Sequence, residues 1–309
     1  MPGHGRHRAP VVASRTRRPP PRDLTSPGPP TSSGVVVTDQ SSPTAPTAAL
    51  PVPADFVHRA GVALVTGGTG GLGRVIAREL ARRGSAVAIT YRSDADAARQ
   101  VLDELPSVAS GMHSAHHLDL TDAEATAALV AQLTGSRGPL HTVVHAAGPH
   151  VPMRHLSTVR PEQFATQVAN DTTAFFTLVS ACLPALRQSR GNVVAITTAA
   201  TTRYPARDGL SAAPKAAVEA LVRAFANEEG RFGIRFNCVG PGMLTDGMAE
   251  RLISSGDLDE RALAVARSST PLRRFGSALD IAEAACFLAS DRAGFISGQK
   301  LDVDGGFGV

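Results

Sequence analysis

The chain has 309 residues, of which 43 % are hydrophobic and 4 % aromatic, with no tryptophan. This composition is ordinary for a globular protein with a sizeable core, and the few aromatic residues favour a core of aliphatic side chains, as in helix-on-sheet packing. The formal net charge of +4 suggests a nucleic-acid partner, but residues 1–55 contain six Arg and three Asp and so supply +3 of it. Because no basic cluster interleaved with aromatic residues follows, we expect no nucleic-acid binding.

The cysteines, histidines and hydrophobic runs limit the metal content and the compartment. Cys182, Cys238 and Cys286 are odd in number and far apart, which fits neither a disulfide framework nor the paired spacing of a zinc site. The histidines of residues 113–117 alternate poorly as ligands, so we expect no metal. No run of 18 apolar residues predicts a membrane span, and prolines follow the arginines at 17 and 18 where an export signal needs an apolar stretch. We therefore expect a cytoplasmic protein with no membrane partner.

The N-terminal segment differs in composition from the rest of the chain. Residues 1–54 contain 12 of the 22 prolines and only short apolar pieces. Such a segment buries too little apolar surface to offset the entropy lost on ordering. The sequence therefore predicts a disordered tail at 1–55 and one folded domain at 56–309. A regulatory arm, a linker and an upstream start assignment are all open as explanations of the tail.

From residue 62 onward, short apolar strands alternate with segments whose apolar residues recur at helical spacing. The predicted strands are Val62–Thr66, Ala86–Tyr91, Met112–Leu118, Leu140–His145, Asn192–Thr197, Ile234–Val239 and Lys300–Val303. The predicted helices are Leu72–Arg83, Ala95–Leu105, Ala123–Leu133, Pro161–Gln188, Pro214–Gly230 and Leu279–Ala289. This rhythm predicts an α/β fold, a Rossmann-type doubly wound parallel sheet of seven strands in a single domain, with ligands at the carboxyl ends of the strands.

A glycine-rich turn, residues 66–73 with the sequence TGGTGGLG, joins the first strand to the first helix. Backbone amides and the helix dipole at such a turn hold a pyrophosphate, and glycine lets the backbone approach the phosphates closely. The spacing Gly67-x-x-x-Gly71-x-Gly73 differs from the general dinucleotide fingerprint. It resembles the motif of the short-chain dehydrogenases/reductases.

Later segments carry the same resemblance over residues 58–307. They are Asp119-Leu120, His145-Ala146-Ala147-Gly148, Asn237, Pro241-Gly242 with Thr245, Pro271-Leu272, Phe275-Gly276, Ser297-Gly298-Gln299 and Asp304-Gly305-Gly306. Thr245 stands one residue nearer to Pro241 than the family pattern has it. The resemblance implies a nucleotide site made by Gly67, Thr69, Gly71, Leu72, Gly73, Tyr91, Arg92, Asp119, Leu120, His145, Ala146, Ala147, Gly148, Lys215, Pro241, Gly242 and Thr245.

The end of the second predicted strand bears on the choice of coenzyme. An acid there would accept hydrogen bonds from the ribose 2′-OH of NAD. In this sequence, the residue that looks like the counterpart of that acid is Tyr91, and Arg92 follows it. A guanidinium pairs with a 2′-phosphate that an acid would repel. We therefore expect NADP(H) rather than NAD(H), with a solvated loop charge as the alternative reading of Arg92.

The catalytic positions depart from the family pattern. Lys215 lies in a segment, SAAPKAAV, that resembles the Tyr-x-x-x-Lys helix, which puts Ser211 at the position of the Tyr that donates or accepts the substrate proton. Thr198, 13 residues earlier, takes the place of the Ser that orients the carbonyl. Asp171 takes the place of the Asn of the water relay, with the neighbouring Asn170 as the alternative. Up to three of the four catalytic groups are thus replaced.

These replacements change the chemistry expected of the site. The Ser211 oxygen stops short of where a phenol reaches, and its hydroxyl is far less acidic than a Tyr with a pKa of about 10. Ser211, three residues before Pro214, also resembles a helix N-cap. A carboxylate at Asp171 would pair with Lys215. The candidate substitutes for the proton donor are Tyr204, His150, His155 and a water held by Ser211 and Lys215.

Three functions fit these observations. The first is an NADP(H)-dependent, ketoreductase-like oxidoreductase acting on a carbonyl or alcohol with an altered proton donor. The second is a non-redox enzyme on the same scaffold, such as a dehydratase, cyclase or isomerase, and the third is a nucleotide-binding pseudoenzyme. A nucleophilic Ser211–Lys215 dyad lacks an evident oxyanion site. The two longest predicted helices resemble those that pair subunits in the family, so we expect a homotetramer or homodimer, and the segment Met243–Ser268 suggests an apolar substrate face.

Overall fold

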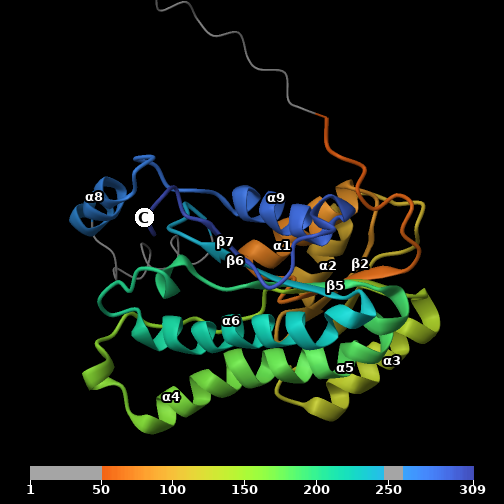
Figure 1. Ribbon diagram of the computed structural model, residues 1–309, viewed down its shortest axis with the longest axis horizontal. Helices are drawn as coiled ribbons and strands as arrows, with labels where there is room; N and C mark the ends of the chain where they lie inside the picture. The colour runs from red at the N-terminus through yellow and green to blue at the C-terminus, as the bar shows by residue number, and fades with distance from the viewer. Residues whose placement is uncertain (1–50, 247–259) are drawn as a thin grey trace, which may run out of the picture. The chain divides into compact units, whose positions relative to one another are not determined.

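The computed structural model describes residues 51–246 and 260–309 (Figure 1). The tail expected at 1–55 lies almost entirely outside the described residues, and so does the middle of the segment Met243–Ser268. Asp55, the last residue of the expected tail, is part of the folded unit, because its carboxylate accepts two hydrogen bonds of 2.9 Å from Arg292. Phe56 beside it is fully buried.

Seven parallel strands form a single sheet in the order β3-β2-β1-β4-β5-β6-β7. The strands are β1 (Val62–Thr66), β2 (Ala86–Tyr91), β3 (Ser114–His117), β4 (Leu140–His145), β5 (Asn192–Ile196), β6 (Arg235–Pro241) and β7 (Lys300–Val303). The predicted doubly wound sheet is confirmed. Its strand order reverses between β1 and β4, and a crevice opens at that point in sheets of this kind.

Helices cover both faces of the sheet (Figure 1). One face carries α1 (Gly71–Arg82), α2 (Ala95–Glu104) and α9 (Ala278–Ala289). The other carries α3 (Ala123–Arg137), α4 (Pro161–Val168), α5 (Ala174–Ser189) and α6 (Gly209–Glu229), while α8 (Glu260–Ser269) follows the undescribed segment. Successive strand residues point to opposite faces, so that Leu64 joins one buried cluster and Val65 the other. No helix in the described ranges is long and apolar enough to cross a membrane.

Short helical turns connect these elements. They are η1 (Leu156–Thr158), the π turn η2 (Ala169–Thr173), η3 (Ala199–Thr201), η4 (Gly230–Phe232) and η5 (Asp291–Ala293). The π turn divides the long helix expected at Pro161–Gln188 into α4 and α5. The strand expected from Met112 begins only at Ser114, because the ring nitrogen of His113 accepts the Val87 N–H, at 3.1 Å, in place of a backbone ladder bond.

The start of α6 corrects one expectation. Ser211 is not a helix N-cap, because the helix begins at Gly209 and its N-cap residue is Asp208. The Asp208 carbonyl already accepts the backbone N–H groups of Ser211 at 3.0 Å and Ala212 at 2.9 Å. Ser211 therefore lies in the first turn, and Pro214 lies inside the helix rather than in that turn.

Candidate active site

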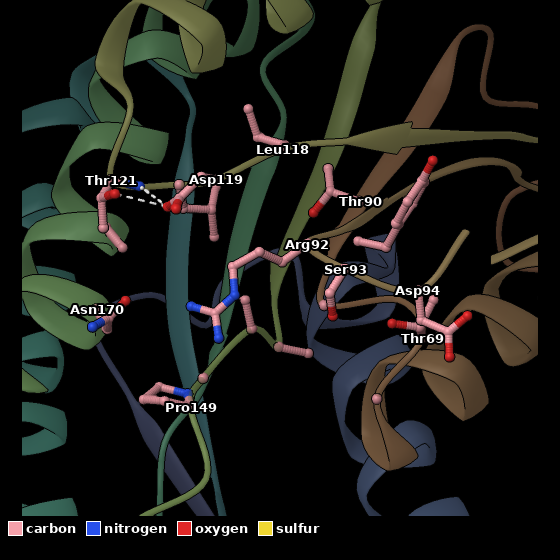
Figure 2. Close-up of a pocket in the computed structure, with 18 of the residues that line it drawn as sticks. Thr69, Thr90, Arg92, Ser93, Asp94, Leu118, Asp119, Thr121, Pro149 and Asn170 are labelled. Atoms are coloured by element: carbon pink, nitrogen blue, oxygen red, sulfur yellow. Dashed lines mark hydrogen bonds between the residues drawn. The ribbon is translucent and has the colours of Figure 1, made fainter. Parts of the chain in front are cut away.

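A cavity of about 490 Å³ lies at the carboxyl ends of β1, β2, β3 and β4 (Figure 2). Its position matches the crevice expected where the strand order reverses. The predicted nucleotide-site residues that line it are Gly67, Thr69, Tyr91, Arg92, Asp119, Leu120, Ala146, Ala147 and Gly148. The described residues contain no group of three His, Cys, Asp or Glu side chains that could hold a metal ion.

The glycine turn between β1 and α1 is tightly packed. Gly67 has a φ of +65°, and a Cβ there would lie 2.7 Å from the Cα of Ala147. A Cβ on Gly73 would lie 2.2 Å from the carbonyl oxygen of Gly67. Only glycine fits these two positions without a shift of the backbone. The turn ends at the N-cap of α1, Gly70, where free N–H groups and the helix dipole favour an anion.

Polar side chains line the opposite end of the cavity. The Asp119 carboxylate accepts hydrogen bonds from the backbone and the hydroxyl of Thr121, at 2.9 and 2.7 Å, and these bonds hold its pKa below the usual value. Arg92 follows β2, and its side chain extends across the cavity toward Pro149 and Asn170 (Figure 2).

The sequence reasoning missed several lining residues beside the predicted ones. Thr90, Ser93, Asp94 and Pro149 all border the cavity. Asp94 also caps α2 by accepting the Ala97 N–H at 2.8 Å. The signal that could have found them is position, because each lies within three residues of the carboxyl end of β2 or in the segment after β4.

The other predicted nucleotide-site residues do not line the cavity. Gly71, Leu72 and Gly73 form the first turn of α1. After β6, the Gly242 N–H donates to the carbonyl of Val303 at 3.0 Å, and the Thr245 N–H donates to that of Gly276 at 2.9 Å. None of Gly71, Leu72, Gly73, Pro241, Gly242, Thr245, His145 and Lys215 is among the described residues that line the cavity.

His145, at the end of β4, is 3 % exposed. Its Nδ1 lies 3.1 Å from the Thr66 hydroxyl, so it links β4 to β1 beneath the cavity. Burial lowers the pKa of the imidazole to about 4; the charge of Lys215 lowers it as well, and that of Asp171 opposes the shift. At neutral pH the ring is therefore uncharged.

Lys215 and Asp171 form a buried ion pair. The Lys215 ammonium lies 3.2 and 3.3 Å from the two Asp171 carboxylate oxygens. The side chains are 17 % and 4 % exposed, and the Gln167 amide donates to the same carboxylate. This is the pairing expected if Asp171 faced Lys215.

Backbone geometry holds this pair at the edge of the cavity. Asp171 lies in the π turn η2, and the hydroxyl of Thr172 donates to the carbonyl of Pro214 in α6 at 3.0 Å. A Cβ on Gly148, which lines the cavity, would lie 3.5 Å from the Asp171 Oδ1. Asn170 also lines the cavity, but its amide donates to the carbonyl of Thr166 at 2.8 Å.

The remaining predicted catalytic residues are half-buried. Thr198 is the N-cap residue of η3 after β5, and its hydroxyl accepts the Ala200 N–H at 3.1 Å. Ser211 lies one helical turn before Lys215 on α6. Two of the candidate substitutes for the missing phenol, His150 and Tyr204, are exposed, Tyr204 to 66 %. Of these two, His150 lines the cavity and Tyr204 does not. His155 is also exposed and precedes η1.

One acid near these residues was missed by the sequence reasoning. Asp208 is half-buried at the start of α6, and burial raises its pKa to about 6, although the charge of Lys215 acts in the opposite direction. The available signal was its spacing, three residues before Ser211 and seven before Lys215.

Comparisons with known proteins agree with this architecture. A family model described as enoyl-(acyl carrier protein) reductase matches residues 67–308. The L-fucose dehydrogenase of Bos taurus is 32 % identical over 245 residues, covering 79 % of this chain and 88 % of that protein. The 3-oxoacyl-(acyl-carrier-protein) reductase FabG of Staphylococcus aureus is 31 % identical over 246 residues, covering 79 % and 96 %. The solved structure of a short-chain type dehydrogenase/reductase from Mycobacterium ulcerans has a TM-score of 0.74 at 29 % identity, covering 80 % and 90 %.

The fold, the glycine turn and these matches together define a class. The chain belongs to the short-chain dehydrogenase/reductase family and is an oxidoreductase of that type. The resemblance seen in the motifs is confirmed. A solved levodione reductase structure, 26 % identical with a TM-score of 0.75 over 80 % of this chain, is a further similar structure.

Proposed function

We propose that this protein is an NADP(H)-dependent oxidoreductase of carbonyl and alcohol substrates whose proton donor differs from that of its relatives. The observation that carries the proposal is the cavity between β1, β2 and β4, with a glycine turn at one end and Arg92 at the other. The curated relatives include dehydrogenases and reductases of sugar and 3-oxoacyl substrates by name. Such substrates carry the carbonyl or hydroxyl carbon that this chemistry needs.

The residues present fit a dinucleotide. The close approach of Gly67 to Ala147 and of Gly73 to Gly67 leaves the backbone bare where phosphates would lie. When bound, the reduced coenzyme supplies a hydride. The chain's own part is to hold the pyrophosphate at the start of α1, to bind a 2′-phosphate through Arg92, and to place Lys215 beside the nicotinamide ribose, as the family resemblance implies. We propose Thr198 for orienting the substrate oxygen.

Arg92 gives a test of the coenzyme preference. The loss of a charge-assisted contact to a 2′-phosphate costs about 1.5–3 kcal/mol, so Arg92→Ala should weaken NADPH binding about 10- to 150-fold by calorimetric titration and leave NADH binding within about twofold. Arg99→Ala is the matched control, because Arg99 is exposed on α2 and pairs with Asp96. Equal losses for both coenzymes would refute the NADP(H) assignment.

The altered proton donor needs a second test. We propose that Ser211 stands where relatives carry the catalytic Tyr. Purified protein with NADPH and a panel of ketones, including acetoacetyl-CoA and a cyclic dione, is followed at the nicotinamide absorbance. Ser211→Tyr should raise the reduction rate, because a phenol of pKa about 10 is far more acidic than an aliphatic hydroxyl. A Ser211→Tyr protein that binds NADPH and is slower than the parent would contradict this role.

The same experiment separates the other two functions. Binding of NADPH without turnover in the parent leaves the non-redox enzyme and the pseudoenzyme. The Lys215–Asp171 pair beside the cavity supports the former, since these groups could carry out acid–base work. Conversion of a 3-hydroxyacyl thioester to its enoyl product without oxidation of the coenzyme would identify a dehydratase.

We also propose a homodimer or homotetramer acting in the cytoplasm. Phe164 on α4 and Phe176 on α5 are 39 % and 49 % exposed, and exposed aromatic side chains of this kind are covered in many subunit interfaces. Light scattering tests the assembly, and the mass of a single chain would refute it.

A further inference from the structure

A lysine, two threonines and two carboxylates gather where β7, η3 and α6 meet, and we call these five residues the Lys300 cluster. The Lys300 ammonium lies 2.5 Å from the Thr201 hydroxyl and 3.0 Å from that of Thr202. It also lies 3.0 Å from an Asp302 carboxylate oxygen and 3.3 Å from one of Glu219. The side chains of Lys300, Glu219 and Asp302 are 14 %, 9 % and 23 % exposed, so water screens their charges only weakly.

The two threonine hydroxyls are fixed in the cluster from two sides. The Thr201 hydroxyl accepts a hydrogen bond from the Lys300 ammonium and donates one to Glu219 of α6, at 2.7 Å. The Thr202 hydroxyl accepts from the same ammonium and donates to Asp302 of β7, also at 2.7 Å. Hydrogen bonds with a charged partner are about twice as strong as those between neutral groups. The end of η3 is therefore attached to both α6 and β7.

The sequence brings the charged groups of the cluster together on one face of the sheet. Lys300 and Asp302 are two residues apart on β7, so their side chains point to the same face. They lie over Gly240 of β6, where a Cβ would stand 2.0 Å from the Asp302 Oδ1 and 2.6 Å from the Lys300 Cε. Lys215 and Lys300 are the two lysines among the 31 basic residues of the chain. A compact ammonium with three rotatable donors suits the four surrounding oxygens better than the planar fork of an arginine would.

The cluster is joined to a candidate catalytic residue on each side. Thr198 is the N-cap residue of η3, and its carbonyl oxygen lies 3.1 Å from the Thr201 hydroxyl. Glu219 follows Lys215 by one turn of α6, so the two residues share a face of that helix. A single helical turn such as η3 is not stable by itself, because helix nucleation is unfavourable. The position of Thr198 relative to Lys215 therefore depends on the contacts that hold η3.

We propose that the Lys300 cluster positions Thr198, with Lys300 and Thr201 as the positioning residues. The idea rests on the proposed function, in which the Thr198 hydroxyl orients the substrate oxygen. None of the five cluster residues is among the described residues that line the cavity. The cluster therefore acts through Thr198, and its loss should slow the chemical step while leaving the affinity for the coenzyme unchanged.

The first test needs no coenzyme and no substrate. Thr201→Val keeps the shape of the side chain, removes the hydroxyl and leaves the three charges of the cluster paired, while Thr201→Ser keeps the hydroxyl and is the matched control. In hydrogen exchange of the full chain followed by mass spectrometry, residues 198–203 should exchange about 10- to 100-fold faster in Thr201→Val, because a hydrogen bond to a charged group is lost. They should stay within about twofold of the parent in Thr201→Ser, and the peptide containing η5 should not change in either variant. Equal exchange of residues 198–203 in the parent and in Thr201→Val would overturn the proposal.

Lys300→Met tests the part played by the ammonium itself. This variant leaves the Glu219 and Asp302 carboxylates without their shared cation, so residues 198–203 should exchange at least as fast as in Thr201→Val. Arg99→Met, which removes an exposed ion pair on α2, is the control and should leave that exchange unchanged. Exchange at the parent's rate in Lys300→Met would deny the ammonium any role and overturn the proposal.

The second test uses NADPH and whichever ketone of the panel is turned over. Thr201→Val should lower kcat about 10- to 100-fold, because displacing a catalytic group by about 1 Å has an effect of that size, and should leave the Kd of NADPH within about twofold. Thr201→Ser should retain the parent's kcat within about threefold. In a Thr198→Val protein, Thr201→Val should lower kcat by less than about threefold, because the hydroxyl that it positions is already absent. A merely structural role predicts the same loss in both backgrounds, and that result would refute the proposal.

The outcomes separate this proposal from the proposed function. Turnover of a ketone with the same kcat in the parent and in Thr201→Val would refute the role of the Lys300 cluster and leave the reductase intact. Failure to bind NADPH would refute the reductase, while the hydrogen exchange of residues 198–203 still decides whether the cluster holds η3 and Thr198.

Discussion

Removing both members of the Lys215–Asp171 pair should destabilise the protein by less than the sum of the losses caused by removing each one alone. Lys215→Met leaves a carboxylate that is 4 % exposed with the Gln167 amide as a remaining donor. An uncompensated buried charge of this kind costs about 3–5 kcal/mol. Asp171→Asn leaves an ammonium that is 17 % exposed, next to an amide oxygen that still accepts a hydrogen bond, so we expect about 2–3 kcal/mol.

The double variant tests this reasoning, because it removes both charges together. We expect the Asp171→Asn and Lys215→Met changes to be non-additive by about 2–3 kcal/mol, with the double variant about as stable as Lys215→Met alone. Urea unfolding followed by circular dichroism measures the four proteins, at one protein concentration because assembly would shift the midpoints. Additivity within about 0.5 kcal/mol, or a larger loss for Asp171→Asn than for Lys215→Met, would refute the burial argument.

Three further changes probe the turn, the core and the acid of α6. Gly73→Ala should weaken NADPH binding at least about tenfold, because the new Cβ would meet the Gly67 carbonyl oxygen at 2.2 Å; Gly135→Ala on α3, with nothing within 4 Å, should instead stabilise by about 0.5–1 kcal/mol. Phe56→Ala should lower the free energy of unfolding in urea by about 3–5 kcal/mol, since the ring is fully buried. A loss below about 1 kcal/mol would mean that the folded domain begins after Phe56. Because the pKa of Asp208 is raised to about 6, the folded state binds more protons than the unfolded state between about pH 4 and 6. The unfolding free energy of the parent should therefore fall by about 2 kcal/mol, relative to that of Asp208→Asn, as the pH rises through this window. Parallel plots of unfolding free energy against pH for the two proteins would contradict the shift.

The sheet and the glycine turn after β1 could be predicted because their signals are local and repeated. The β1 run Val62–Thr66 is buried throughout, and Gly67 and Gly73 after it occupy positions where a Cβ would collide with backbone. Strand and turn are therefore both specified by the twelve residues 62–73. The right-handed crossovers between parallel strands limit the orders in which seven such strands can pair.

The surroundings of the candidate catalytic residues were harder to predict, because a shift of one residue along a helix changes which side chain faces the site. The helix α6 starts three residues earlier than the Ser211 N-cap reading required, since the Asp208 carbonyl is already bonded into it. The π turn carries one extra residue per turn and leaves no sign in the hydrophobic pattern. It is this turn that directs Asp171 rather than Asn170 toward Lys215. The exposure of Asp208 likewise depends on packing that no local pattern encodes.

The neutral imidazole of His145 has a consequence for coenzyme exchange. An oxidised nicotinamide ring is cationic and a reduced one is not, so a protonated histidine under the cavity would disfavour the oxidised form as the medium became acidic. With a pKa of about 4, the ring contributes no such repulsion at any pH above about 5. Lowering the pH toward about 5 should therefore cause no change, through His145, in the ratio of the affinities for the oxidised and the reduced coenzyme.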